Sequence, residues 1–559
     1  MKFLVGRITL VLAGVLMLVA WLVPNHYYPW LSAYNEFAAV VSVLLFFGVV
    51  ALSEASSEAN CTVFFCLVVA LIPAFQYFSG VVWFFGDAFI CISYVFMFGL
   101  SVFSGRAAVK IWRIERVFFI FCLIFLIGAV VSVFIALSQW LRLPVSIWVL
   151  ELLPGSRPYA NLGQPNILAT LLALGVVAGF YLFEVKRLGA LLGFVLIFLL
   201  AFGLVLTRSR TPWVAGVCVL VWWAFNRREI ESEVSSSVVV GWFIFYWFLV
   251  FLYPYIGRFI FGEGVAVSEY AYNSQRVDIW GQMLVSIFKG GLLGYGWGQV
   301  GIAQLDVASN IPVGLRVEYS HNILIDLLVW NGPVLGCLII LVSVVWLLRQ
   351  ALLSRSKEDV YVFMMVGVIL VHGLLEFPLS YFYILLPLGV LLGGVDKSSF
   401  LSLGIPRFLL FFIFLFSSAV WCLSWFEYRA AEEDNRNMRF LVNKFYGASK
   451  VSDTHEPFLF DNLSDFVRFA RLDPARHVSE RELEWAGRVA WRFPNASSLY
   501  RYAVMLAVSG NVCEAGKQLL LIQYLHGKDK YAEALDSMRV SQIDALRTVA
   551  KNRIEWCLH

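Results

Sequence analysis

Long apolar runs separated by short polar segments fill the first three quarters of this sequence. Each run approaches the roughly 20 apolar residues that a helix needs to cross the hydrocarbon core of a bilayer. The pattern therefore predicts an all-α polytopic membrane protein with about 13 transmembrane helices. The predicted spans are 5–23, 36–53, 60–78, 82–103, 117–140, 166–183, 188–206, 211–226, 238–256, 321–348, 360–374, 377–394 and 406–425.

The polar remainder of the chain predicts a second domain. Charged residues make up about a tenth of residues 1–425 but more than a quarter of residues 426–559. We therefore predict a membrane domain, 1–425, and a soluble helical domain, 426–559. Apolar residues at spacings of three and four around Gly510 predict two helices joined by a turn, as in a tetratricopeptide-like unit, which either binds peptides or simply packs.

Lysine and arginine are unevenly distributed over the predicted loops, and this asymmetry predicts the orientation. Cytoplasmic loops are rich in these residues, so the N-terminus is expected in the cytoplasm. The first apolar run follows two basic residues as in a signal peptide, but it is long and lacks a cleavage site, so we expect it to be a span. The odd number of spans then places the soluble domain and the long loop 257–320 outside the cytoplasm, which is the periplasmic side of the inner membrane if the cell is Gram-negative. The lysine and arginine residues in the short loops on that outer side are only Arg142, Arg157, Arg208 and Arg210.

The composition of the chain argues against one class of function, nucleic-acid binding. The chain is 60% hydrophobic and 14% charged, with a formal net charge of +4. It contains no basic tract with interleaved aromatic residues, so nucleic-acid binding is not expected.

Of nine cysteines, Cys513 and Cys557 lie in the polar part, where they either pair after export or stay as two thiols. Five glycines within 290–298 are expected to let the backbone approach a ligand or another helix.

Polar residues that are unusual for a membrane protein gather at the predicted outer face. Asp87 is expected about two turns inside its span, while His372 and Glu376 are four residues apart and share one helix face if helical. The candidate site residues are His26, Asp87, Arg157, Gln164, Asn166, Arg208, Arg210, Arg276, Ser320, His321, Asn322, Asp326, His372 and Glu376.

These residue types suit transfer from a lipid diphosphate. Arginine presents paired donors that match phosphate oxygens, and such donors stabilise the charge that a leaving diphosphate gains. A histidine can accept the proton of an attacking hydroxyl. No metal-ligand spacing, P-loop or nucleophile elbow is visible, so neither a metal nor a cofactor is expected.

For each of these residues, a structural or lipid-anchoring role remains open as an alternative to a role in a site. An interfacial arginine is often an anchor for lipid headgroups, and a histidine at a helix start is often structural. Glu36 and Asp87 either belong to a site or only cap helices or pair with an arginine. A proton-driven transporter would more often place ionisable groups at mid-span, and a membrane scaffold would leave the one-sided arginines unexplained.

The sequence resembles the PglL-type bacterial protein O-oligosaccharyltransferases, within the superfamily of O-antigen ligases and polymerases. The resemblance extends over almost the whole chain. Its motifs are Pro24–Trp30, Pro73–Gln76, Gly86–Ala88, Arg157–Thr170, Thr207–Thr211, Arg276–Trp280, Gly294–Gly298, Ser320–Asn322, His372–Leu379 and Trp491–Ala515. Where the family usually has glutamine before Ser209-Arg210, this chain has Arg208.

The resemblance implies a GT-C-like glycosyltransferase that moves a preassembled glycan from undecaprenyl diphosphate to serine or threonine of exported proteins such as pilins. It implies that His321 is the catalytic base or positions the acceptor, and that Arg210 and Arg276 bind the diphosphate. The remaining candidates are assigned to substrate binding. The alternatives are an O-antigen ligase or polymerase, with lipid A core or a glycan as acceptor, and a lipid-linked glycan transporter.

Overall fold

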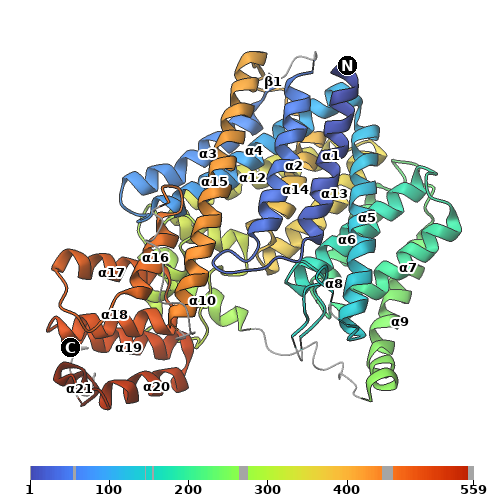
Figure 1. The fold of residues 1–559 in the computed structure, drawn as a ribbon. Helices are drawn as coiled ribbons and strands as arrows, with labels where there is room; N and C mark the ends of the chain where they lie inside the picture. Colours follow the sequence, from blue (N-terminus) through green and yellow to red (C-terminus); the bar gives the residue numbers. More distant parts are fainter. Residues whose placement is uncertain are drawn as a thin grey trace. The chain divides into compact units, whose positions relative to one another are not determined.

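The computed structural model of the chain describes residues 2–53, 58–144, 146–153, 156–262, 275–442 and 457–551. Within these ranges the chain is almost entirely α-helical (Figure 1). Its strands are β1 (Glu58–Ala59) and β2 (Leu403–Gly404), which pair antiparallel. The predicted all-α class is confirmed.

Each predicted span corresponds to a helix. These helices are α1 (Lys2–Leu22), α2 (Ala33–Ala51), α3 (Cys61–Phe78), α4 (Phe85–Trp112), α5 (Ile114–Trp140), α6 (Pro165–Glu184), α7 (Ala190–Leu206), α8 (Thr211–Asn226), α9 (Ser236–Phe261), α12 (Ile323–Leu352), α13 (Lys357–Leu375), α14 (Phe382–Val395) and α15 (Arg407–Val442). A short 3-10 turn, η2 (Pro378–Ser380), precedes α14. The other helices are α10 (Arg276–Lys289), α11 (Val300–Val307), α16 (Asp461–Arg471), α17 (Glu480–Arg492), α18 (Ala496–Val508), α19 (Val512–His526), α20 (Lys528–Arg539) and α21 (Asp544–Lys551).

Helix length separates two groups of apolar helices. In the described part of the chain, ten helices are long and apolar enough to cross a membrane, and α7, α8 and α14 are shorter apolar helices. The chain is therefore a multi-pass membrane protein. The 16 residues of α8 span about 24 Å at 1.5 Å per residue, less than the ~30 Å of a hydrocarbon core. The count of thirteen crossings accordingly stays a prediction.

The start of α4 differs from the prediction. Asp87 was expected two turns inside a span that begins at residue 82, but α4 begins at Phe85 and Asp87 lies in its first turn. The carboxylate of Asp461 accepts hydrogen bonds from the amides of Phe85 at 3.0 Å and Gly86 at 2.7 Å. Because free amides at a helix start need acceptors, this distant carboxylate fixes where the helix begins.

The chain divides into two compact units, each assembled from separate segments. Unit 1 comprises Met1–Val69, Tyr94–Asn273 and Ser343–Leu423, and unit 2 comprises Ala70–Ser93, Ser274–Val342 and Ser424–His559. Helix α15 runs without interruption across residues 425 and 426, where the composition changes. The division into domains 1–425 and 426–559 stays a prediction.

Glycines allow a close contact between α4 and α14 in unit 1. A β-carbon on Gly105 of α4 would lie 2.1 Å from the Val390 carbonyl oxygen of α14. A β-carbon on Gly393 of α14 would lie 2.0 Å from the Val102 carbonyl oxygen of α4. Only glycine permits this backbone approach, which is a common way for helices to pack in membranes.

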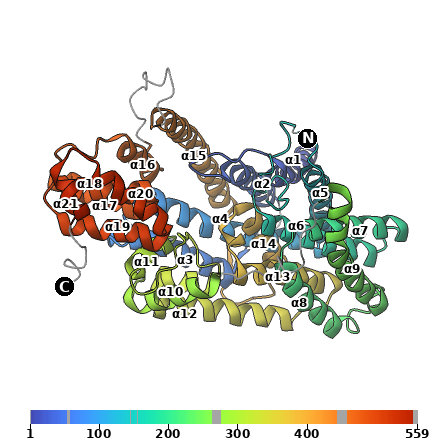
Figure 2. The same ribbon diagram turned by 90° about the horizontal axis from the view of Figure 1, so that it is seen from below.

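Unit 2 joins the predicted outer loop to the C-terminal helices. Leu305 of α11 is buried in the same hydrophobic cluster as Leu499 of α18 and Leu519 of α19. The amide of Gly314 also donates to the Tyr524 carbonyl at 2.8 Å. Figure 2 shows α10 and α11 beside the C-terminal helices of this unit. Residues 275–320 of the predicted outer loop are therefore part of the packed structure of unit 2.

The predicted helix, turn and second helix are present as α18 and α19. Gly510 occupies the turn with φ +85°, a left-handed conformation that favours glycine. Cys513 is disulfide-bonded, and Cys557, the other member of the predicted pair, lies outside the described residues. The likeness to a tetratricopeptide unit stays a prediction.

The glycine-rich segment approaches another helix, which was one of the two predicted explanations. A β-carbon on Gly294 would lie 2.4 Å from the Gly332 backbone nitrogen. Gly332 breaks the regular geometry of α12 with φ 73° and ψ 170°. The side chain of Gln76 fastens the two segments, since its Nε2 donates to the Trp330 carbonyl at 2.8 Å and its Oε1 accepts from the Trp297 amide at 2.9 Å.

Candidate active site

His321 occupies a strained turn at the start of α12. Its φ of 61° lies in the left-handed region, which costs a residue with a β-carbon roughly 1–2 kcal/mol. The preceding Ser320 is fully buried, and its amide donates to Asp326 Oδ1 at 2.8 Å. The Asp326 carboxylate also interacts electrostatically with His321. This aspartate therefore holds the turn that presents the imidazole.

Asn322 completes the turn as a helix cap. Its Oδ1 accepts from the amide of Leu324 at 3.0 Å, and its carbonyl accepts from the Ser320 hydroxyl at 3.0 Å. Amides in a first helical turn have no partner within the helix, so an asparagine here stabilises the start of α12. Within the Ser-His-Asn motif, serine and asparagine thus fix the backbone on either side of the histidine.

Helix α10 packs against this turn through Trp280. The indole Nε1 of Trp280 donates to the Ser320 carbonyl at 2.9 Å. Arg276 is the first residue of α10 and is half-buried. Residues four apart lie on the same helix face, so the face of α10 that meets Ser320 also carries Arg276. The predicted base and one predicted diphosphate ligand therefore belong to neighbouring segments of unit 2.

A second group of predicted residues joins α6 to α13 in unit 1. Asn166 Nδ2 donates to Glu376 Oε1 at 2.7 Å, and the Thr170 hydroxyl lies 2.5 Å from His372 Nδ1. A shared helix face for His372 and Glu376 was expected only if both are helical, but α13 ends at Leu375 and Glu376 has an extended backbone, so this expectation does not apply even though both side chains contact α6. All four side chains are buried. We infer that His372 and Glu376 hold the start of α6 in place.

The segment before α6 packs on His26. The imidazole Nε2 of His26 lies 2.9 Å from the Asn161 carbonyl oxygen. A β-carbon on Gly163, whose φ is +70°, would come within 3.1 Å of the same ring. Burial lowers the pKa of His26, and the hydrogen bond to Asn161 opposes this only in part. Gln164 follows as the extended N-cap residue of α6 and is half-buried.

Three arginines meet at the turn between α7 and α8. Arg157 Nη1 donates to the Arg208 carbonyl at 3.1 Å. Arg208 has φ 49°, again a left-handed conformation at a residue with a β-carbon. Arg210 is exposed at the N-cap position of α8. This turn therefore carries the side chains of Arg208 and Arg210 and is contacted by Arg157 from another loop of unit 1.

Asp87 is engaged by the C-terminal helices of unit 2. Arg492 of α17 donates to both of its carboxylate oxygens, and Asn462 of α16 donates to Oδ1 at 2.8 Å. The pairing of Asp87 with an arginine was one of the two predicted interpretations. We infer that Asp87 positions these helices, while its assignment to substrate binding stays a prediction.

Sequence reasoning assigned no role to Gln76, Trp280, Asn462 or Arg492. Three of them lie in the motifs quoted above, which is the signal that could have identified them. Asn462 lies outside those motifs, and its contact with Asp87 required the fold.

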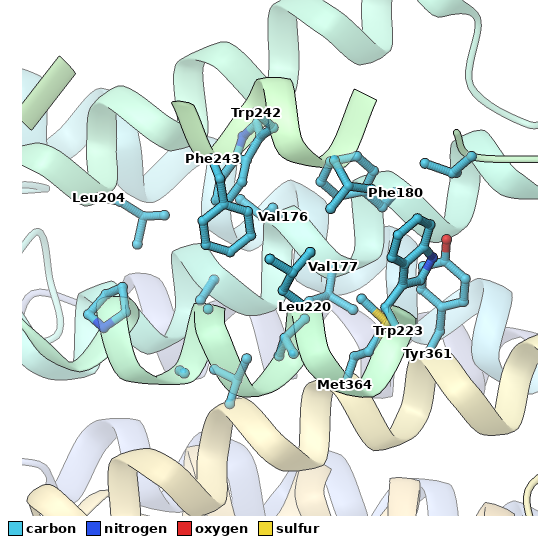
Figure 3. A pocket seen from close by; sticks show the side chains of 18 residues that line it. Val176, Val177, Phe180, Leu204, Leu220, Trp223, Trp242, Phe243, Tyr361 and Met364 are labelled. Carbon is cyan, nitrogen blue, oxygen red and sulfur yellow. The ribbon is translucent and has the colours of Figure 1, made fainter. Parts of the chain in front are cut away.

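An apolar cavity of about 60 Å³ lies apart from these groups within unit 1. Figure 3 shows the side chains of Phe180, Trp223, Trp242 and Phe243 around it. None of the predicted site residues lines it. Since transfer from a diphosphate needs polar groups, this cavity is not the reaction site.

Comparison with known families identifies three matching regions. Residues 158–183 match the family described as protein glycosylation ligase, and residues 194–338 match the O-antigen ligase family. Residues 360–540 match the C-terminal family of virulence factor membrane-bound polymerases. Together the matched regions include the predicted site residues at the His321 turn in unit 2 and those that join α6 to α13 in unit 1.

Two curated relatives from Acinetobacter baylyi are similar along most of their length. A general O-oligosaccharyltransferase is 28% identical, with 98% of this chain and 96% of the relative aligned. A ComP-specific O-oligosaccharyltransferase is 28% identical, with 88% of this chain and 90% of the relative aligned. The chain is thus a glycosyltransferase, and over most of its length it resembles the PglL-type O-oligosaccharyltransferases, with regions that match the O-antigen ligase and protein glycosylation ligase families.

Proposed function

We propose that this chain transfers a preassembled oligosaccharide from undecaprenyl diphosphate to serine or threonine of exported proteins such as pilins. The observation that carries the proposal is the strained His321 turn, fastened by Asp326 and by Trp280 of the helix that begins with Arg276. Strain held by surrounding hydrogen bonds is typical of functional positions. The similarity to two named O-oligosaccharyltransferases supports the same reaction.

In this reaction the acceptor hydroxyl attacks the anomeric carbon of the lipid-linked sugar. A carbon–oxygen bond forms there while the bond to the diphosphate oxygen breaks. His321 accepts the hydroxyl proton or positions the hydroxyl. Arg276 and Arg210 stabilise the charge on the departing undecaprenyl diphosphate, and Arg157, Arg208, Gln164 and Asn166 shape the donor or acceptor site.

The proposed location is the inner membrane, with the N-terminus in the cytoplasm and the reaction and C-terminal helices on the periplasmic side. The distribution of lysine and arginine supports this orientation. The disulfide of Cys513 supports it as well, because disulfides persist in oxidising compartments.

Purified full-length protein in detergent, with lipid-linked oligosaccharide and a serine-containing acceptor peptide, tests the proposal. We expect a peptide mass increased by the glycan, loss of this product with His321→Ala, and its retention with His477→Ala, which changes an exposed histidine of the tail. Full activity of His321→Ala would remove this residue from the mechanism. Transfer without a sealed membrane would exclude a transporter.

The matches to O-antigen ligase and membrane-bound polymerase families favour a second candidate function. In that case the acceptor is lipid A core or a growing glycan rather than a protein. Mass spectrometry of pilin from cells with and without this chain distinguishes the two. A glycan on pilin serine that depends on the chain supports protein glycosylation, and unmodified pilin with altered lipopolysaccharide supports the second candidate.

A further inference from the structure

Unit 1 contains a large cavity whose walls come from α1, α2, α4, α5, α14 and α15. Its volume is about 1210 Å³, larger than the roughly 300–1,000 Å³ of typical small-molecule pockets. Most of the lining is apolar, with Leu10, Val43, Phe121 and Phe414 contributed by four different helices. Such a wall matches long hydrocarbon chains better than a soluble metabolite.

Three arginines line the same cavity. Arg7, Arg116 and Arg407 are exposed and lie within the first two turns of α1, α5 and α15. Figure 1 shows the beginnings of these helices at one end of the unit, beside the N-terminus. The described residues that line the cavity include no aspartate or glutamate. The cavity therefore combines an apolar body with a positively charged mouth.

We propose that this cavity binds an anionic diacyl phospholipid, with its phosphate against the three arginines and its acyl chains along the apolar wall. Guanidinium groups form paired hydrogen bonds with phosphate oxygens, and basic pockets between membrane helices bind anionic headgroups in this way. A zwitterionic headgroup would bring its ammonium group toward three positive charges, so it fits less well.

The ligand differs from the proposed glycan donor. The distribution of lysine and arginine predicts that this end of unit 1 faces the cytoplasm and that the motifs of the proposed reaction face the other side. Anionic phospholipids are abundant at the cytoplasmic surface. The lipid would thus be a structural component of the membrane helices, and its binding is testable without measuring glycan transfer.

Native mass spectrometry of delipidated full-length protein tests the proposal by titration with phosphatidylglycerol and, separately, with phosphatidylethanolamine. We expect phosphatidylglycerol to bind more tightly. Replacing Arg7, Arg116 and Arg407 together with glutamine should weaken its binding at least tenfold, since each basic residue contributes roughly fivefold. A matched variant with Arg113, Arg187 and Arg349 replaced by glutamine loses the same charge outside the cavity and should bind normally.

A second variant tests the apolar part of the site. Leu10→Trp adds bulk to the wall while leaving all three arginines in place, so it should also reduce phosphatidylglycerol binding. Equal binding of the two lipids, or unchanged binding by the arginine variant, would overturn the proposal. Displacement of phosphatidylglycerol by equimolar undecaprenyl phosphate would show instead that the cavity takes an isoprenoid phosphate.

Discussion

Arg492 donates two hydrogen bonds to Asp87, from Nε to Oδ2 at 2.6 Å and from Nη2 to Oδ1 at 2.8 Å, although 405 positions separate these residues in the sequence. The Asp87 side chain is 6% exposed and that of Arg492 is 24% exposed. A planar guanidinium paired with a buried carboxylate is among the strongest ion pairs that proteins form. This pair attaches α17 to the start of α4.

Arg492→Ala should destabilise the protein by about 3–5 kcal/mol, because it leaves the Asp87 carboxylate buried without its main partner. Thermal unfolding of detergent-solubilised protein, followed by tryptophan fluorescence, measures this. Arg488→Ala is the control, since it breaks an exposed pair with Glu484 on the same helix and should change stability by less than about 0.5 kcal/mol. Equal melting temperatures for the two variants would contradict the role given to Arg492.

Trp280→Phe should lower the rate of glycan transfer about five- to tenfold. The change removes the indole hydrogen bond to Ser320. If the His321 turn is then less well positioned, the activation free energy of transfer rises by about 1 kcal/mol, the value of one hydrogen bond. Trp213→Phe removes a bond of similar length, 3.0 Å to the Tyr246 hydroxyl, away from the His321 turn, and should retain activity. Initial rates with acceptor peptide compare the two, and equal rates would separate Trp280 from the reaction.

Asn166→Asp should reduce activity more than tenfold, because it faces the buried Glu376 carboxylate with a second negative charge. Combining it with Glu376→Gln exchanges the amide and the carboxylate. The glutamine amide then donates to the new aspartate, so the double variant should recover most of the lost activity. If the double variant is no better than Asn166→Asp alone, the two residues do not act as a pair.

Gly294→Ala should prevent folding or lower the melting temperature strongly, since its β-carbon would collide with the backbone of α12 at 2.4 Å. Gly291 is a matched control with nearly the same φ, +70° against +67°, and no heavy atom within 4 Å of the added carbon. Gly291→Ala should cost only about 1 kcal/mol from the backbone conformation. Expression level and melting temperature measure both, and similar losses would mean that the contact is unimportant.

His26 should make stability depend on pH. Burial lowers its pKa in the folded protein from the ordinary 6.5, so the unfolded chain binds the proton more readily. The contribution of neutral His26 is then complete above pH 6.5 and decreases as the pH falls through the lowered value. The melting temperature of wild type minus that of His26→Gln should therefore shrink between pH 7 and pH 5. A constant difference would show that His26 does not titrate in this way.

The hydrophobic pattern by itself determined the class of this protein and the approximate position of its helices. Membrane lipid provides no hydrogen-bond partners, so an apolar run of spanning length must form a helix. Local motifs also marked His321 and the arginines, because charged and polar groups are rare beside such runs.

Tertiary structure decided which polar groups meet and where each helix begins. The start of α4 depends on Asp461, and Asp87 is neutralised by Arg492, both contributed by residues more than 370 positions away. Similarly, the conformation of His321 depends on Trp280 and Asp326. Hydrogen bonds and ion pairs act over a few ångströms in space rather than along the chain, so packing of distant segments selects the partner of each polar group.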